Sequence, residues 1–172
     1  MKRIITLGLF LVIMMVMVSP VSAKGGSFGV GWGLPYGIMG GNLDYNILSN
    51  FDLSIGLGVS PLSGFSFNLG GKLYLRSEEE NFRPRVSCYY GTNTMVDETG
   101  YFDLEDDYKN YNGVTAGIGF SVYFGSLGRR GLEVDLLYRV STEADIDGLE
   151  AQGYDTEGIE KVTMSIGYRQ KF

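Results

Sequence analysis

The sequence contains no histidine and a single cysteine, Cys88, among its 172 residues. Without histidine the chain cannot build a histidine-ligated metal centre or a Ser-His-Asp catalytic triad. One cysteine cannot form an internal disulfide. Basic residues are also scarce, and the net charge of −6 argues against nucleic-acid binding, which needs a basic surface. We therefore expect no cofactor and no enzymatic activity.

Long hydrophobic runs are absent except at the start of the chain, where residues 4–18 are almost continuously apolar. Two basic residues precede this run, and small residues ending at Ala23 follow it. A bilayer-spanning helix needs about 20 apolar residues, so the run fits a secretory signal peptide better than a membrane anchor. The sequence predicts a signal peptide over 1–23, cleaved after Ala23, and one mature domain over 24–172.

Apolar and polar residues alternate with a period of two along most of the mature chain, a pattern typical of strands with one apolar face. The stretch 51–60 is the clearest example, with Leu53, Ile55 and Leu57 on one face. Most of the alternating segments approach the roughly 9–11 residues with which a tilted strand crosses a bilayer. The predicted strands cover 27–35, 38–48, 51–60, 65–76, 84–96, 112–124, 131–141 and 160–172.

The connections between the predicted strands differ in length at the two ends of the meander. The second, fourth and sixth connections are short, whereas the fifth and seventh form long loops over 97–111 and 142–159. Both long loops therefore lie at one end and both termini at the other. The predicted fold class is all-β, an eight-stranded antiparallel up-and-down transmembrane β-barrel.

Alternation alone does not decide which face of the barrel is wet, because a soluble lipocalin-like barrel buries its apolar face and a membrane barrel exposes it. The face opposite the apolar one is rich in glycine, including Gly31, Gly56 and Gly119. Glycine leaves nothing to pack on a soluble surface, but it fits the crowded interior of a narrow barrel. The composition favours a membrane barrel, and a soluble secreted lipocalin-like binder is an alternative.

Charged residues on the glycine-rich face fall near the strand ends on the side of the termini. Antiparallel pairing brings such residues together, and unpaired charges in a packed lumen would cost several kcal/mol. We therefore expect an interior ion-pair network, with solvated surface charges as the alternative. The expected members are Asp52, Arg76, Glu133, Asp135, Arg169 and Lys171. Other long side chains, among them Lys72, Arg85 and Arg139, are expected to help fill the lumen.

The last predicted strand carries Met164, Ile166, Tyr168 and Phe172 on one face. This resembles the C-terminal signal that the barrel-assembly machinery reads in bacterial outer-membrane proteins, although Gln170 stands where an aromatic residue is common. The signal peptide, eight strands and long loops at one end are together similar to the OmpA-transmembrane-domain and OmpX-like small barrels. The resemblance implies a monomer of porin-like topology in a Gram-negative outer membrane, in contact with its lipid and lipopolysaccharide.

The two long loops are rich in acidic residues. The segment 143–148 matches the first positions of an EF-hand calcium loop, but Tyr154 stands where the bidentate Glu is needed. The EF-hand interpretation therefore fails, and a looser divalent-cation site is a weak hypothesis. Its candidate ligands are Glu143, Asp145, Asp147 and Asp155. Solvated loops that keep the exposed end soluble, or a contact surface for a basic extracellular partner, are the other interpretations.

These observations predict a structural, surface-displaying outer-membrane barrel that exposes the loops 97–111 and 142–159 for adhesion or for cation or partner binding. A narrow channel or small-solute transport barrel is the alternative among membrane proteins. It is disfavoured because eight strands leave little lumen once long side chains occupy it.

Overall fold

The computed structural model describes residues 25–60, 64–77, 80–97, 108–125, 128–144, 148 and 161–172. The predicted signal peptide and most of both long loops lie outside these residues. The strands are β1 (Gly26–Gly33), β2 (Ile38–Leu48), β3 (Phe51–Ser60), β4 (Gly64–Tyr74), β5 (Phe82–Asp97), β6 (Tyr108–Phe124), β7 (Arg130–Arg139) and β8 (Val162–Lys171). A short 3-10 helix, η1 (Leu34–Tyr36), joins β1 to β2. Within the described part of the chain, no helix is long and apolar enough to cross a membrane.

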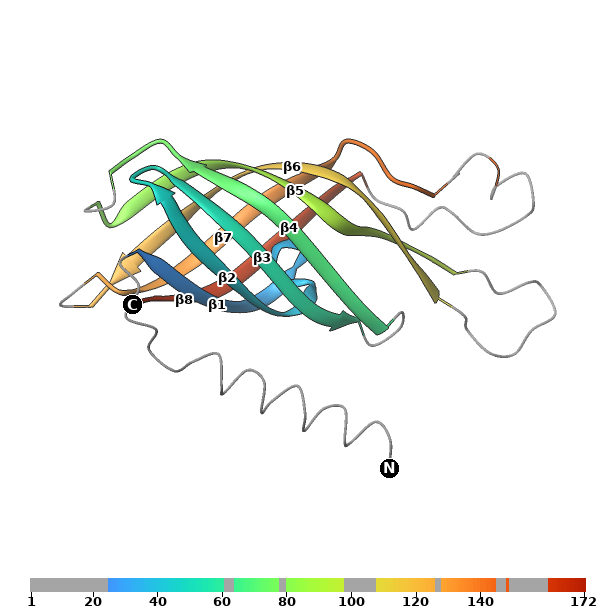
Figure 1. Cartoon of the computed structure of the whole chain (residues 1–172), viewed down its shortest axis with the longest axis horizontal. Helices are drawn as coiled ribbons and strands as arrows, with labels where there is room; N and C mark the ends of the chain where they lie inside the picture. Colours follow the sequence, from blue (N-terminus) through green and yellow to red (C-terminus); the bar gives the residue numbers. More distant parts are fainter. Residues whose placement is uncertain are drawn as a thin grey trace, which may run out of the picture.

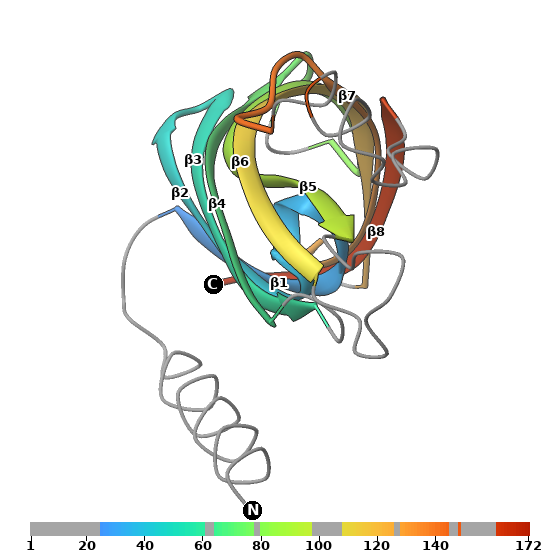
Figure 2. The same ribbon diagram turned by 90° about the vertical axis from the view of Figure 1, so that its right-hand side faces the viewer.

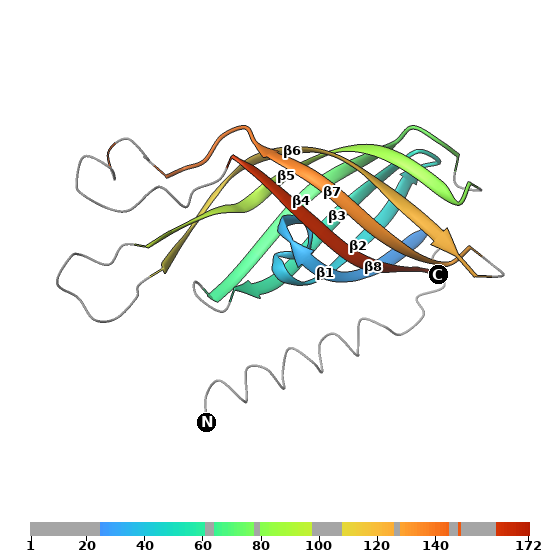
Figure 3. The same cartoon turned by 180° about the vertical axis from the view of Figure 1, so that it is seen from behind.

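The eight strands form one closed barrel in which each strand pairs with its neighbours in the sequence (Figure 1). All pairs are antiparallel, and β1 pairs with β8, from Ser27 opposite Lys171 to Trp32 opposite Ile166, to close the sheet (Figure 3). The predicted fold class is therefore confirmed. Closure pairs the backbone hydrogen-bonding groups along the ladders and leaves no sheet edge in the paired region.

The hairpin of β5 and β6 is longer than predicted and extends beyond the rest of the barrel at the end opposite the C-terminus (Figure 1). Its ladder continues to Asp97 opposite Tyr108, past a bulge between Thr92 and Thr94. The predicted start of this sixth strand at residue 112 is therefore four residues too late. Polar residues near the hairpin end interrupt the alternation in the sequence but still pair through their backbones.

The strands bury their polar face and expose their apolar face. In β3, Asp52 and Ser54 are buried, whereas Ile55 and Leu57 are exposed. Among the described residues, the buried set is dominated by polar and charged residues, and the exposed set includes many large Val, Leu, Ile, Met and aromatic residues. This pattern is the reverse of that in a soluble protein, where large apolar residues are mostly inside.

The connection between β1 and β2 does not turn at the rim of the barrel. Residues 34–37, here called the inner turn, fold back into the barrel, where Tyr36 is completely buried (Figure 2). Pro35 suits the first turn of the 3-10 helix, and the amide of Gly37 donates a hydrogen bond of 3.0 Å to the carbonyl of Leu34. The predicted extension of the first strand to residue 35 is therefore wrong.

The glycine-rich interior face makes room for the inner turn. A Cβ atom at Gly56 would overlap the carbonyl oxygen of Pro35, and one at Gly31 would lie 2.8 Å from the Tyr36 ring. Asn68 of β4 donates a hydrogen bond of 2.6 Å to the carbonyl of Leu34. The interior glycines thus have a specific role, because they leave space for a chain segment inside the barrel.

Candidate functional site

Six charged side chains from five strands meet in the interior beneath the inner turn. This interior charge cluster has three acidic and three basic members, so its formal charge is zero. All six are buried, with at most 3 % of any residue exposed. The members are Asp44 of β2, Lys72 of β4, Arg85 of β5, Glu133 and Asp135 of β7, and Arg169 of β8.

Glu133 lies at the centre of the interior charge cluster. Its carboxylate accepts hydrogen bonds from Arg85 at 2.9 Å and from Arg169 at 2.7 Å. It also accepts hydrogen bonds from the Tyr36 hydroxyl at 3.0 Å and the Ser121 hydroxyl at 2.9 Å. The Tyr36 contact joins the inner turn directly to the cluster, so these two interior features form one packed unit.

The other two acids complete the pairing of the basic members. Asp135 accepts two hydrogen bonds from Arg85, at 3.1 Å from Nε and 2.7 Å from Nη2. Asp44 pairs with Lys72 at 2.8 Å and also with Arg169. Bidentate and multiply shared contacts of this kind are what allow buried charges to be tolerated.

The sequence-predicted network coincides with this cluster at three positions, Glu133, Asp135 and Arg169. The prediction that Arg76 belongs to the interior network is wrong. Its side chain is half exposed and pairs with Glu80 at 2.9 Å. The reason is that β4 ends at Tyr74, so Arg76 lies in the following turn rather than on the inner face. A solvent-exposed pair of this type contributes little to stability.

The two remaining predicted members lie elsewhere in the interior. Asp52 is buried and accepts a hydrogen bond of 2.6 Å from Asn46. The ammonium of Lys171 lies 3.9 Å from the centroid of the Tyr123 ring. Nearby at the same end, the guanidinium of Arg83 lies 3.8 Å from the centroid of the Tyr74 ring. These contacts form an aromatic-lined layer between the cluster and the end that carries the C-terminus.

Asp44, Lys72 and Arg85 belong to the cluster but were not among its predicted members. Lys72 and Arg85 were expected only to fill the lumen. Asp44 could have been found from the alternation in β2, because it shares the inward face with Asn42, opposite the outward Tyr45. The pairing partners depend on barrel closure and strand tilt, which the sequence pattern does not specify.

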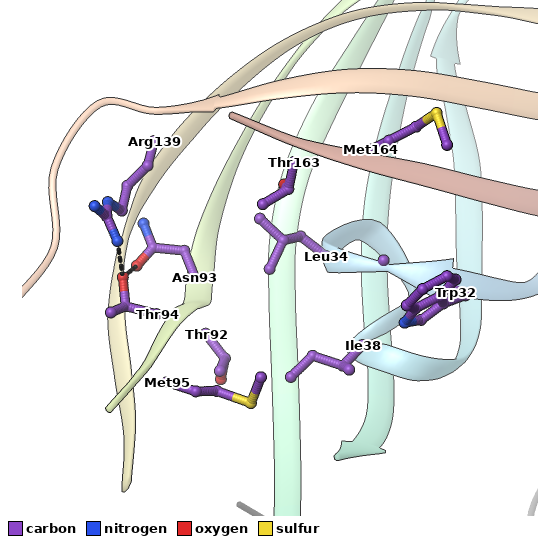
Figure 4. A pocket seen from close by; sticks show the side chains of 11 residues that line it. Trp32, Leu34, Ile38, Thr92, Asn93, Thr94, Met95, Arg139, Thr163 and Met164 are labelled. Atoms are coloured by element: carbon purple, nitrogen blue, oxygen red, sulfur yellow. Dashed lines mark hydrogen bonds between the residues drawn. The ribbon is translucent and has the colours of Figure 1, made fainter. Parts of the chain in front are cut away.

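A cavity of about 260 Å³ lies on the other side of the inner turn (Figure 4). Its polar wall includes Arg139, which donates a hydrogen bond of 3.0 Å to the Thr94 hydroxyl. The apolar wall consists of Trp32, Leu34, Ile38, Met95 and Met164. The cavity therefore combines a cationic group with an extended apolar surface.

The weak metal-site hypothesis involves residues that are largely undescribed. Asp145, Asp147 and Asp155 lie outside the described residues, and Glu143 accepts a hydrogen bond of 2.9 Å from Tyr90. Within the described ranges, no group of three or more His, Cys, Asp or Glu side chains is arranged so that it could hold a metal ion.

The residues predicted as an assembly signal lie on the outer face of β8 and just after it. Met164, Ile166, Tyr168 and Phe172 are all exposed, whereas Gln170 is half-buried and pairs in register with Phe28. The four side chains thus form an apolar stripe on the outside of the closing strand. Their recognition by an assembly machinery stays a prediction.

Comparison with solved structures identifies a similar barrel. The chain matches the crystal structure of the N-terminal β-barrel domain of Pseudomonas aeruginosa OprF with a TM-score of 0.57. The match covers 86 % of this chain and 96 % of the OprF domain, at 15 % sequence identity. The chain has the OmpA-like eight-stranded barrel fold. At this identity the structural similarity shows the fold alone. No protein-family model and no curated protein matches the sequence.

Proposed function

We propose that the protein is an integral outer-membrane β-barrel with a closed lumen, whose role is structural and surface-displaying. The observation that carries this proposal is the apolar outer face, which continues around the strands from Val30 of β1 to Tyr168 of β8. Soluble monomers rarely expose a contiguous apolar patch larger than a few hundred Å². A surface of this kind calls for a hydrocarbon environment, and this argues against the lipocalin-like alternative.

Aromatic residues support the same orientation in a membrane. Trp32 and Phe65 are exposed on the outer face toward the end with the long loops, and Phe82, Phe124 and Phe172 are exposed toward the opposite end. Outer-membrane barrels carry aromatic girdles at both interfaces of their apolar band. A closed sheet also meets the requirement that backbone groups in lipid be paired within the protein.

The filled interior favours a structural role over a channel. An eight-stranded barrel has an interior just wide enough for side chains to fill. Here the interior charge cluster and the inner turn occupy it together, joined by the Tyr36–Glu133 hydrogen bond. A transported solute would have to displace both. The strand ends that flank the acidic loops 97–111 and 142–159 lie at the opposite end from the C-terminus. Binding of a basic partner or of divalent cations by these loops stays a prediction.

Fractionation and gel mobility test the proposal. The full chain, expressed with its leader in a Gram-negative host, is expected in the outer-membrane fraction and should migrate faster unheated than boiled. Recovery as a detergent-independent soluble monomer would overturn the membrane assignment. In planar bilayers the purified barrel is expected to give no steady conductance, and a stable open current would favour the channel alternative.

A further inference from the structure

The barrel wall is notched beside the cavity above the inner turn. Pairing of β1 with β8 ends at Trp32 opposite Ile166, and residues 162–165 of β8 continue beyond this last pair. The inner turn takes the chain into the lumen at this level instead of extending β1. At the end of the barrel with the long loops, the ladder between β1 and β8 therefore stops before the ladder between β7 and β8, which continues to Val162.

The cavity runs from this notch into the lumen. Trp32 and Met164 line it although they are 65 % and 68 % exposed on the outer face. Arg139, Asn93 and Thr94 line its other end, with Leu34 and Thr163 between the two groups (Figure 4). One cavity thus connects residues of the lipid-facing surface with a cation and hydrogen-bonding groups inside the barrel.

Backbone strain occurs at the same place. Ile38 has a φ of 71° and is the only non-glycine residue with a positive φ among the described residues. A β-branched residue rarely adopts this strained conformation. Such strain is concentrated at functional sites. At this site it positions an apolar side chain in the cavity wall.

We propose that this cavity binds a fatty acid, with its carboxylate at Arg139 and its acyl chain leaving through the notch between Trp32 and Met164. The charge of Arg139 complements a carboxylate, and charge-assisted hydrogen bonds to guanidinium groups are among the stronger polar contacts. The apolar wall accommodates methylene groups. The inference rests on the proposed function, because a lipid-facing wall is what brings an acyl chain to the notch.

The cavity volume fits only part of such a ligand. At about 30 Å³ for each water-sized group, 260 Å³ holds roughly nine groups, enough for a carboxylate and a short stretch of methylenes. The remainder of a long acyl chain then lies along the outer face in the lipid. The cavity itself therefore holds only the carboxylate and the adjoining methylene groups.

Trp32 is the single tryptophan of the chain and serves as the reporter. The purified barrel in neutral detergent is titrated with 11-bromoundecanoate, whose bromine quenches tryptophan fluorescence, at a pH where the carboxylate is ionised. The uncharged 11-bromoundecanol is the matched probe. We expect saturable quenching by the carboxylate at mole fractions where the alcohol gives only a shallow, linear decrease.

Two variants locate the site. Arg139→Gln is expected to weaken the carboxylate binding at least tenfold, whereas Arg130→Gln, at the other end of β7, leaves it within twofold. Thr163→Phe fills the cavity and is expected to abolish saturable quenching while Arg139 remains. Equal quenching by both probes, or unchanged binding in either cavity variant, would overturn the proposal. Heat-modifiable migration of each protein tests the barrel separately, so loss of binding in an intact barrel bears on the fatty-acid site alone.

Discussion

Neutralising Glu133 is the most informative perturbation of the barrel interior. Glu133→Gln keeps the shape of the side chain but leaves three cations facing two carboxylates in the interior charge cluster. The hydrogen bonds from Arg85 and Arg169 then lose their charged acceptor. Removing one partner of a buried ion pair costs about 3–5 kcal/mol, because it leaves uncompensated charge in a poorly solvated site. That loss corresponds to a shift of roughly a hundred- to several-thousand-fold in the unfolding equilibrium.

Urea unfolding of the barrel in lipid vesicles, followed by the heat-modifiable gel band, measures this loss. Glu80→Gln is the matched control, since it removes the same charge from an exposed pair with Arg76 and should change stability by less than about 1 kcal/mol. Adding Lys72→Met to Glu133→Gln restores neutrality and should recover part of the loss. If Glu133→Gln stays within about 1 kcal/mol of the wild type, the cluster does not stabilise the barrel as argued here.

Three further perturbations test the inner turn and the outer face. Tyr36→Phe removes a hydrogen bond to a charged acceptor and should lower the unfolding free energy by about 1.5–3 kcal/mol in the same urea assay. Gly58→Val places side-chain atoms where the backbone of the inner turn lies, and this overpacking should lower the unfolding free energy by about 1–3 kcal/mol in the urea assay. Ile55→Arg, on the lipid-facing side of β3, should destabilise the barrel by about 2–4 kcal/mol, whereas Ile55→Leu should cost less than about 1.5 kcal/mol.

The strand arrangement could be predicted from the sequence because its signal is local. Alternation in 51–60 matches β3 at both ends, and the same pattern specifies which side chains of β7 face inward. Strand ends were less predictable. β4 ends at Tyr74, and a pattern that continues to Arg76 does not reveal this, because the end depends on pairing with β5.

The inner turn could not be predicted, because nothing in 34–37 distinguishes a turn at the rim from one folded into the lumen. The information lies in distant glycines such as Gly56 and Gly167, whose missing side chains leave the space that the turn fills. The partners in the interior charge cluster are equally non-local. Arg85 and Asp135 are 50 residues apart in the sequence. Their side chains meet only because the closed barrel turns the inner faces of β5 and β7 toward each other.

The central claim, that the apolar face of the barrel contacts lipid, can be tested at Cys88. This single cysteine is exposed on the outer face of β5, in register with Gly71 of β4 and Ala116 of β6. A nitroxide spin label at Cys88 of the vesicle-reconstituted protein reports its collisions with oxygen, which concentrates in lipid, and with a water-soluble nickel chelate. The account predicts high accessibility to oxygen and low accessibility to the chelate. The opposite ranking would place this face in water and contradict the membrane barrel.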